Sequence, residues 1–378
     1  MLTRFRVQGF KSLLDVELEL APLVVLMGPN ASGKSNLLEA LLLLSRLATE
    51  QTLSAALEPP LRGYPLEAFS LPEGGLEALL QQDCADLSLE AVVQPSQTEQ
   101  SGSQALNYRA GVRIQPKTGA LEKTDELLNN KNLSRSFTYS QLLDLKLLHR
   151  ELATWQTYYL DPRVAMREPQ PPREVTDIGP RGEWIAPFLH RLKESENHFK
   201  YFRAIGRALQ QAIPTIESLE VDLDPRRGTL DILIQQDGTS YSSRVVSEGT
   251  LRVLALCCLA ANPWPGKLVA FEEPENGVHP RRIEVIADLL ASMASEGKSQ
   301  VVVTTHSPTL IAAMLQKSQE NPGQIKLFRC SQIGRATQVK PFEISGPLLN
   351  DPEIREALTG PEDAQVVEAL LKRGWLDG

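Results

Sequence analysis

One stretch near the start of the chain has the residue types and spacing of a phosphate-binding loop. Residues 28–35 read GPNASGKS, between an apolar run at 24–27 and an apolar helical segment at 37–47. In a G-x-x-x-x-G-K-S loop, glycines let successive backbone N–H groups point into one concavity. Lys34 supplies a charge for the β- and γ-phosphates, and Ser35 a hydroxyl for Mg²⁺. A chance glycine-rich turn would lack the flanking strand and helix. The predicted nucleoside triphosphate ligands are Asn30, Gly33, Lys34 and Ser35.

A group of carboxylates follows a second apolar run. Residues 267–275 read KLVAFEEPE, which is typical of a core strand that ends in three acidic residues. In phosphate-loop enzymes an acidic residue at such a strand end positions Mg²⁺. We therefore predict that Glu272 is a metal ligand and that Glu273 orients or deprotonates the attacking water. The alternative is a solvated acidic turn after a core strand, which is a common arrangement.

Two more motifs combine polar residues with the ends of regular elements. In QVVVTTHSP, His306 directly follows the apolar run, at the carboxyl end of a predicted strand. Open α/β sheets place ligands there, so His306 is a candidate γ-phosphate sensor. A lone histidine is more often structural. In VSEGTLR, Ser247 is suited to cap a helix and Gly249 keeps backbone donors open to an anion. A capped helix without any further function is the alternative at this position.

The pattern of apolar residues predicts the elements that position these motifs. Strands are expected at 2–8 and 14–20, 87–93 and 106–114, which fit an antiparallel sheet, and at 216–223 and 229–235. Helices are expected over 121–150, 183–194 and 196–212. The predicted fold is an α/β phosphate-loop NTPase with a parallel-sheet core, an N-terminal antiparallel β subdomain and a helical insertion. The predicted domains are a nucleotide-binding core at 1–50 and 240–345, an inserted lid at 51–239 and a helical tail at 346–378.

Composition narrows the class of protein. A chain of 378 residues, 42% hydrophobic and 23% charged, is typical of a soluble globular protein with two domains or one large insertion. The net charge of −8 argues against a uniformly basic surface but leaves room for a local basic patch. No apolar run approaches the roughly 18 residues of a membrane span, and the first residues lack a signal-peptide core. The four cysteines show no C-x-x-C spacing, which predicts reduced, buried thiols and a cytoplasmic protein.

The order of these motifs resembles the ATP-binding-cassette ATPases. Within that superfamily the chain is most similar to the group that contains RecF, structural-maintenance-of-chromosomes and overcoming-lysogenization-defect proteins. The stretches that carry the resemblance are FRVQGFKSLLDVELEL, GPNASGKSNLLEAL, VSEGTLRVLAL, FEEPENGVHPRRI and TTHSP. It is specific across residues 1–50 and 245–315, and looser through YYLDPRVAMREP and WIAPFLHRLK.

The resemblance implies a role for each matching residue. Lys34 and Ser35 would hold the phosphates and Mg²⁺, and Ser247 and Gly249 would contact the γ-phosphate bound by a partner subunit. Glu272 would bind Mg²⁺, Glu273 would be the catalytic base and His306 a switch. Arg62 is similar to an arginine of this group that reaches the nucleotide or DNA. The glutamine of the usual Q-loop is not placed, and Gln51 is its nearest candidate.

By this resemblance the chain is an ATPase head that forms a homodimer, or a higher oligomer, around two ATP molecules. It would switch a partner effector or a nucleic acid, in phage defence or DNA repair. The chain lacks long heptad arms and a zinc hook, and the about 70 residues after His306 are too few for an appended nuclease domain. A nuclease or toxin would therefore be a separate partner. The alternatives are a non-hydrolysing, ATP-dependent scaffold for an effector, and the nucleotide-binding subunit of a transporter.

Overall fold

The computed structural model describes residues 1–95, 105–133, 139–295 and 298–342. The chain forms two compact units, Met1–Trp155 with Ser318–Gly378, and Gln156–Lys317. The boundaries of these units differ from the predicted domain boundaries, which fall after residues 50, 239 and 345. The division into a nucleotide-binding core and an inserted lid stays a prediction. The predicted helical tail lies outside the described residues. No helix in the described ranges is long and apolar enough to cross a membrane.

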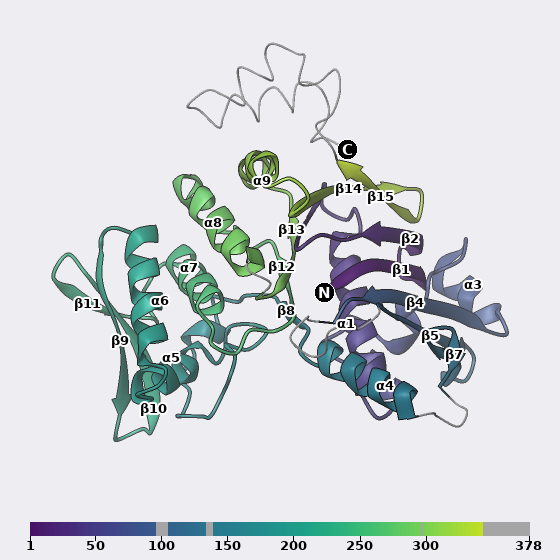
Figure 1. Ribbon diagram of the computed structural model, residues 1–378, viewed down its shortest axis with the longest axis horizontal. Coiled ribbons are helices and arrows are strands. Elements are labelled where there is room, and N and C mark those ends of the chain that lie inside the picture. The colour runs from purple at the N-terminus through teal and green to yellow at the C-terminus, as the bar shows by residue number, and fades with distance from the viewer. Residues whose placement is uncertain (96–104, 134–138, 296–297, 343–378) are drawn as a thin grey trace, which may run out of the picture. The chain divides into compact units, whose positions relative to one another are not determined.

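The first unit contains an antiparallel sheet that includes the N-terminal strands (Figure 1). Its strand order is β2-β1-β4-β5-β6-β7. Alternation decides which face is buried: Phe5 and Val7 of β1 lie in the core, whereas Arg4 and Arg6 reach the solvent face. The strands are β1 (Leu2–Phe10), β2 (Leu13–Glu19), β4 (Ala85–Val93), β5 (Leu106–Gln115), β6 (Ala120–Leu128) and β7 (Lys131–Asn132).

The prediction of a helix over 121–150 is wrong in its first part. Residues 120–128 form β6, which pairs with β5 along the ladder from Gln115↔Ala120 to Tyr108↔Leu128. The sequence LEKTDELL favours a helix through its glutamates, lysine and leucines. Pairing with the neighbouring strand outweighs that preference. The helix α4 is shorter than predicted and covers Tyr139–Leu152.

A second group of strands in the first unit carries the phosphate loop. β3 (Leu23–Met27) is buried along its whole length and runs parallel to β14 (Ile325–Ile333), with Leu26 opposite Phe328. β15 (Ala336–Phe342) pairs with β14 in the antiparallel sense. The loop after β3 leads into α1 (Lys34–Thr49), where Ser45 donates a hydrogen bond of 2.7 Å to the carbonyl of Leu152 in α4. Short helices α2 (Leu53–Leu57) and α3 (Gly75–Gln81) follow.

The second unit is built on parallel strands whose carboxyl ends carry the acidic and histidine motifs. β12 (Leu268–Glu272) lies between β8 (Gln156–Tyr158) and β13 (Gln300–Thr305), and both pairings are parallel. The Phe271 ring stacks on Tyr158 at 5.3 Å between centroids. The parallel β3–β14 pair in one unit and this set in the other confirm the predicted α/β class with parallel core strands and an antiparallel sheet.

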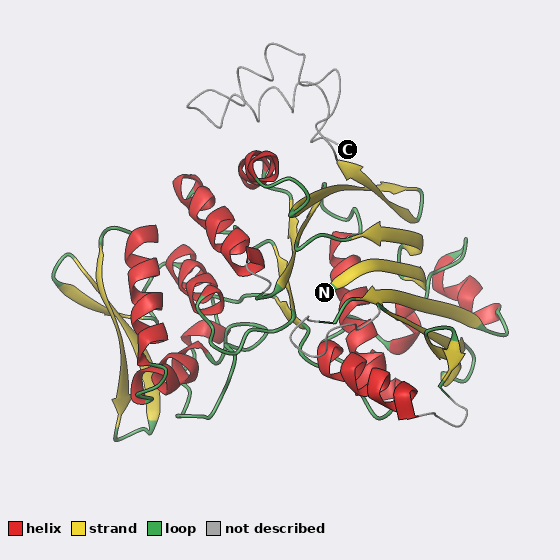
Figure 2. Cartoon of the chain, viewed as in Figure 1, coloured by secondary structure: helices red, strands yellow, loops and turns green. Residues whose placement is uncertain are grey.

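Helices and a small sheet complete the second unit. Figure 2 shows α5 (Ile185–Glu194) and α6 (Phe199–Ala212) beside a three-stranded antiparallel sheet, and both helices contact it. That sheet has the order β11-β10-β9, from β9 (Ile216–Asp224), β10 (Thr229–Gln236) and β11 (Thr239–Ser242). The remaining helices are α7 (Glu248–Ala260), α8 (Ile283–Ala294) and most of α9 (Pro308–Glu320), whose last three residues belong to the first unit.

The cysteines are free, as predicted, but not all of them are buried. Cys257 and Cys258 of α7 and Cys330 of β14 are buried, whereas Cys84 is exposed just before β4. Burial raises the pKa of Cys257 and of Cys330 to about 12, so both thiols stay protonated at neutral pH.

Candidate functional site

The phosphate loop in the first unit has a backbone that requires its two fixed glycines. Gly28 has φ 153° and Gly33 has φ 90°. A Cβ atom at Gly33 would lie 2.0 Å from Thr337 Oγ1, and one at Gly28 would lie 2.2 Å from the carbonyl oxygen of Cys330. Both glycines are therefore fixed by conformation and by packing against β14 and β15.

The polar groups around the loop fit an anion with several oxygens. Lys34 is only 5% exposed, and its Nζ donates hydrogen bonds of 2.8 Å to the carbonyls of Gly28 and Pro29. Ser32 Oγ is buried without a hydrogen-bond partner among the described residues. Gly33 starts the 16-residue helix α1 without a side-chain cap, and the first turn carries no acidic residue. An uncapped helix N-terminus, a buried lysine and a buried hydroxyl are suited to bind phosphate.

Other predicted ligands of the loop lie close by in the chain. Asn30 is exposed at the loop tip, and Ser35 is in the first turn of α1. Gln51, the nearest Q-loop candidate, is exposed just after α1. A role of Gln51 in the site stays a prediction.

A buried carboxylate in the helix that follows the loop joins two basic residues. Glu39 of α1 has 0% exposure, and its Oε2 lies 2.5 Å from Lys11 Nζ. Its Oε1 accepts hydrogen bonds from the backbone N–H of Arg62 at 3.0 Å and from Arg62 Nε at 2.9 Å. Burial opposes ionisation of Glu39, but the hydrogen bonds from Arg62 and Lys11 outweigh it and hold its pKa below the usual value. We call Lys11, Glu39 and Arg62 the loop-support cluster.

The loop-support cluster gives Arg62 a structural contact that the sequence did not predict. The Arg62 side chain is 55% exposed even though its Nε is held by Glu39. Its predicted role as a ligand of nucleotide or DNA stays a prediction. Glu39 itself is detectable in the sequence as an acidic residue inside an otherwise apolar helical run.

In the second unit the two predicted catalytic residues are in contact. Glu273 directly follows Glu272, the last residue of β12, and its Oε1 lies 2.7 Å from His306 Nδ1. Glu273 has φ 45°, a left-handed conformation that costs a non-glycine residue about 1–3 kcal/mol. Its backbone N–H donates to the Thr304 carbonyl at 3.1 Å, which holds the turn against β13. The strand ends thus bring a carboxylate and an imidazole together at the surface.

A third carboxylate lies behind this pair. Glu275 is 5% exposed, accepts a hydrogen bond from the Thr305 hydroxyl and has a buried Oε2 with no partner in the described chain. Burial raises its pKa. The nearby Arg252 of α7 is half-buried, its Nε also has no partner there, and burial lowers its pKa despite the negative charge of Glu275. The acidic turn at 272–275 is therefore not fully solvated, in contrast to the solvated acidic turn that was the alternative for these residues.

The serine-glycine motif forms the start of α7. Ser247 is the N-cap: its Oγ accepts the Thr250 N–H at 3.2 Å and lies 2.8 Å from the Thr250 hydroxyl. Gly249 is buried, and a Cβ there would lie 2.7 Å from the carbonyl oxygen of Gly277. Gly249 is thus required for close packing against the turn after the carboxylates, whatever its part in anion binding. Ser247 is exposed.

The residues present fit a Mg²⁺ ion bound mainly through phosphate oxygens. In the part of the chain that the structure describes, no three His, Cys, Asp or Glu side chains gather as a metal-binding group. Mg²⁺ in nucleotide sites needs only one or two protein ligands together with phosphate oxygens and water. Ser35 and Glu272 are oxygen donors of that kind, each within its own unit.

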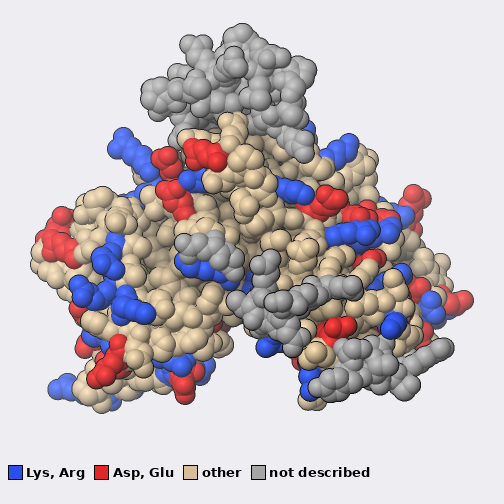
Figure 3. Space-filling view, in the orientation of Figure 1, with Lys and Arg blue, Asp and Glu red and all other residues tan. Residues whose placement is uncertain are grey.

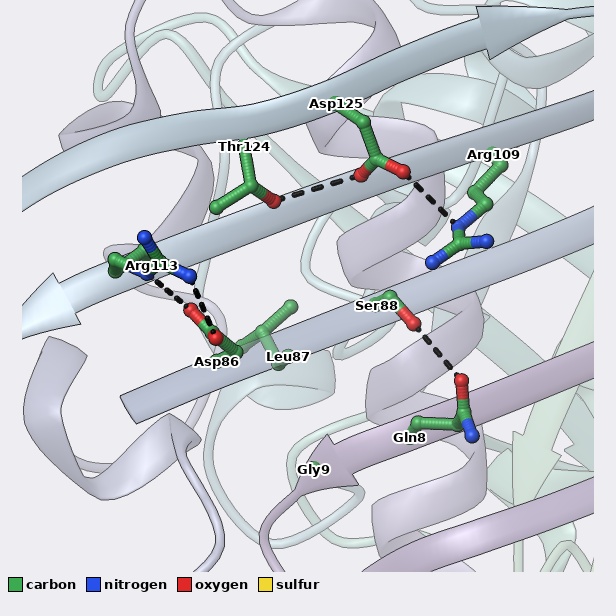
Figure 4. Close-up of a pocket in the computed structure, with 9 residues that line it drawn as sticks. All are labelled: Gln8, Gly9, Asp86, Leu87, Ser88, Arg109, Arg113, Thr124 and Asp125. Carbon is green, nitrogen blue, oxygen red and sulfur yellow. Dashed lines mark hydrogen bonds and ion pairs between the residues drawn. The ribbon is translucent and has the colours of Figure 1, made fainter. Parts of the chain in front are cut away.

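A hollow of about 460 Å³ lies on the solvent face of the antiparallel sheet (Figure 4). Its arginines are paired with carboxylates: Arg113 donates to both oxygens of Asp86 at 2.7 and 2.9 Å, and Arg109 lies 3.2 Å from Asp125. None of the predicted site residues lines it. Its charge is balanced internally, so it offers no concentrated charge to a ligand.

Comparison with known proteins gives one family and a set of solved structures. A family model described as "AAA domain, putative AbiEii toxin, Type IV TA system" matches residues 23–312. A search of curated proteins finds no match. The fold is similar to an Smc head bound to the C-winged helix domain of ScpA, with 18% identity, 91% of this chain and 98% of the other covered, and a TM-score of 0.59.

Two Smc heads from Pyrococcus are similar in the same way. The Pyrococcus furiosus head, solved with an extended coiled coil and the C-terminal domain of ScpA, has 15% identity and a TM-score of 0.55, with 94% and 99% of the two chains covered. The Pyrococcus yayanosii head, solved with a coiled coil and joint, has 12% identity and a TM-score of 0.53, with 91% and 97% covered. At these identities the likeness shows a shared fold.

Proposed function

Because this chain belongs to the family described as "AAA domain, putative AbiEii toxin, Type IV TA system", we propose that it is a Mg²⁺-dependent ATPase that converts ATP and water to ADP and phosphate. The observation that supports hydrolysis of ATP, in addition to ATP binding, is the 2.7 Å contact between Glu273 and His306 at the ends of β12 and β13. A carboxylate in contact with a histidine can take up a proton from water and have its orientation set by the ring.

Each residue has a proposed part in this reaction. Lys34 and the N–H groups of the loop and α1 bind the triphosphate, with Asn30 and Gly33 shaping the loop. Glu273 accepts the proton of the attacking water, and His306 orients Glu273 and senses the γ-phosphate. Mg²⁺, when held by Ser35 and Glu272, would neutralise charge on the phosphate oxygens.

We also propose that two copies of the chain act together as a homodimer. Ser247, an exposed residue, would with Gly249 contact the γ-phosphate held by Lys34 of the other copy. ATP binding would close the dimer and hydrolysis would open it. This change would switch a separate effector protein, a nuclease or toxin, in phage defence or DNA repair in the cytoplasm. Family resemblance is the support for the dimer and the pathway.

An ATPase assay tests the central proposal. We expect Lys34→Ala to lower turnover about 100-fold, because a buried charge that binds the phosphates is lost. Lys117→Ala, at an exposed site in the same unit, is the matched control and should behave like the wild type. Wild-type turnover no higher than that of Lys34→Ala would favour the non-hydrolysing scaffold. Copurification of a membrane subunit would favour the transporter alternative.

The basic residues on one face of α6 support the proposal that a nucleic acid is a further partner. Lys200, Arg203 and Arg207 are exposed and spaced by three and four residues, so they share one side of the helix. None of the three forms an ion pair within the described residues, and α6 contains no acidic residue. Figure 3 shows basic side chains gathered over α6. The net charge of −8 argues against a uniformly basic surface but allows a local basic patch, and these three residues form such a patch.

Charge reversal tests this partner. We expect Lys200, Arg203 and Arg207→Glu together to weaken binding of duplex DNA and to reduce the slope of log affinity against log salt by roughly 3, because each phosphate contact contributes about 0.9. Filter binding at several salt concentrations measures both. Reversal of three exposed lysines in the first unit, Lys117, Lys131 and Lys340, is the control for net charge. Equal losses in both triple variants would argue against α6 as the surface.

A further inference from the structure

Arg167 makes an unusual number of hydrogen bonds to the backbone. It ends a short 3-10 turn (Ala165–Arg167) in the second unit. Its Nε donates to the Pro162 carbonyl at 2.7 Å, and its two Nη atoms donate to three carbonyls of the loop that precedes α7. Those three acceptors are Ser243 at 2.9 Å, Arg244 at 2.7 Å and Val246 at 2.7 Å. The last acceptor is the residue directly before Ser247.

Only an arginine can make this set of contacts. The guanidinium is planar and presents five N–H donors in a fixed fork, whereas a lysine ammonium is a point charge on a flexible stem. The loop also has a second attachment, because the Ser243 N–H donates to the Ile232 carbonyl of β10 at 2.7 Å. Without Arg167, three carbonyls of a non-repetitive loop would lose their hydrogen-bond donor at once.

The segment that carries Arg167 also contacts the other side of Ser247. The Asp161 carboxylate accepts the N–H groups of Arg163 and Val164, both at 3.1 Å, which fixes the turn. Arg163 Nε then lies 2.9 Å from Oε1 of Glu248, the first residue of α7. Residues 161–167 therefore hold the chain both immediately before and immediately after Ser247.

We propose that Arg167 is a positioning residue that holds Ser247 in the orientation needed to act on nucleotide bound by a second copy of this chain. The proposal rests on the proposed function, in which Ser247 completes the site of the other copy. The hydrogen bonds of Arg167 described above all go to carbonyls of its own unit, whereas Lys34 and the phosphate loop belong to the other unit. Loss of Arg167 should therefore affect turnover and leave ATP binding to the loop intact. A residue needed only for folding would affect both.

Mixing of variants separates these possibilities. We expect Arg167→Lys alone to lower turnover at least about 10-fold while its affinity for a fluorescent ATP analogue stays within about 2-fold of the wild type. Mixed with an equal amount of Lys34→Ala, it should recover about a quarter of wild-type turnover, because half of the dimers are mixed and each has one complete site. Mixed with Ser247→Ala it should recover nothing, because both chains lack a competent serine.

A control variant and the pattern of outcomes show which part of the proposal is wrong if the expected turnover is not seen. Arg173→Lys makes the same exchange in the same unit at an exposed arginine and should behave like the wild type. Loss of ATP binding together with turnover in Arg167→Lys, or wild-type turnover, would overturn the positioning role. The positioning role would also be overturned if the mixture of Ser247→Ala with Lys34→Ala recovers turnover and the mixture of Arg167→Lys with Lys34→Ala does not. If the Ser247→Ala pair itself fails to recover, the shared site is wrong and this inference falls with it.

Discussion

Replacing Glu273 with Gln is expected to lower ATP turnover by about 10³-fold while ATP binding stays intact. The amide keeps the size of the carboxylate and can still accept a hydrogen bond from His306, but it cannot take a proton from water. Because the ATP-bound state then persists, the variant should also accumulate as a dimer in the presence of ATP and Mg²⁺. Phosphate release measures the first effect, and light scattering with and without nucleotide measures the second.

A neighbouring carboxylate provides the control for Glu273→Gln. Glu284→Gln, in the exposed first turn of α8, makes the same chemical change in the same unit and should keep wild-type turnover. Full turnover in Glu273→Gln would remove Glu273 from the mechanism. Loss of turnover without ATP-dependent dimers would keep Glu273 as the base and argue against the proposed pair of heads.

The parts of the site that are best predicted from the sequence are those whose residues are close together in the chain or lie at the ends of adjacent strands. The loop at 28–35 needs glycines at fixed places, and the structure gives both of them left-handed or crowded positions. The polar residues at the ends of β12 and β13 were recognisable because an apolar run stops abruptly there. Parallel pairing then brings Glu273 to His306. In each case the residues that matter are neighbours in sequence or sit at equivalent ends of adjacent strands.

Contacts between distant segments were not predictable in the same way. Arg167 and its acceptor Val246 are 79 residues apart, and Glu39 and Arg62 are 23 apart. A single arginine in a proline-rich stretch gives no signal that it holds a loop elsewhere. The strand β6 differs from its sequence prediction for a related reason, because pairing with β5 makes LEKTDELL a strand. These features depend on tertiary context, which local preference does not contain.

The loop-support cluster leads to a prediction about stability. Glu39→Gln should lower the free energy of unfolding of the first unit by about 2–3 kcal/mol, because it removes the carboxylate that pairs with Lys11 and Arg62. The value lies at the lower end for buried ion pairs because Arg62 is 55% exposed and can regain water. Urea unfolding followed by tryptophan fluorescence and by far-UV circular dichroism measures the change.

The effect of Glu39→Gln should depend on pH in a defined direction. The pKa of Glu39 is lowered in the folded chain, so its carboxylate stabilises the fold above the ordinary pKa of a glutamate, and this contribution is lost as the pH falls through the folded pKa. The difference between wild type and variant should therefore be full at pH 7 and shrink in acid. Glu50→Gln, which removes a more exposed partner of Arg46, should cost less than about 0.5 kcal/mol. A difference for Glu39→Gln that is small at pH 7, or unchanged in acid, would mean that the ionised carboxylate does not stabilise the helix that follows the phosphate loop.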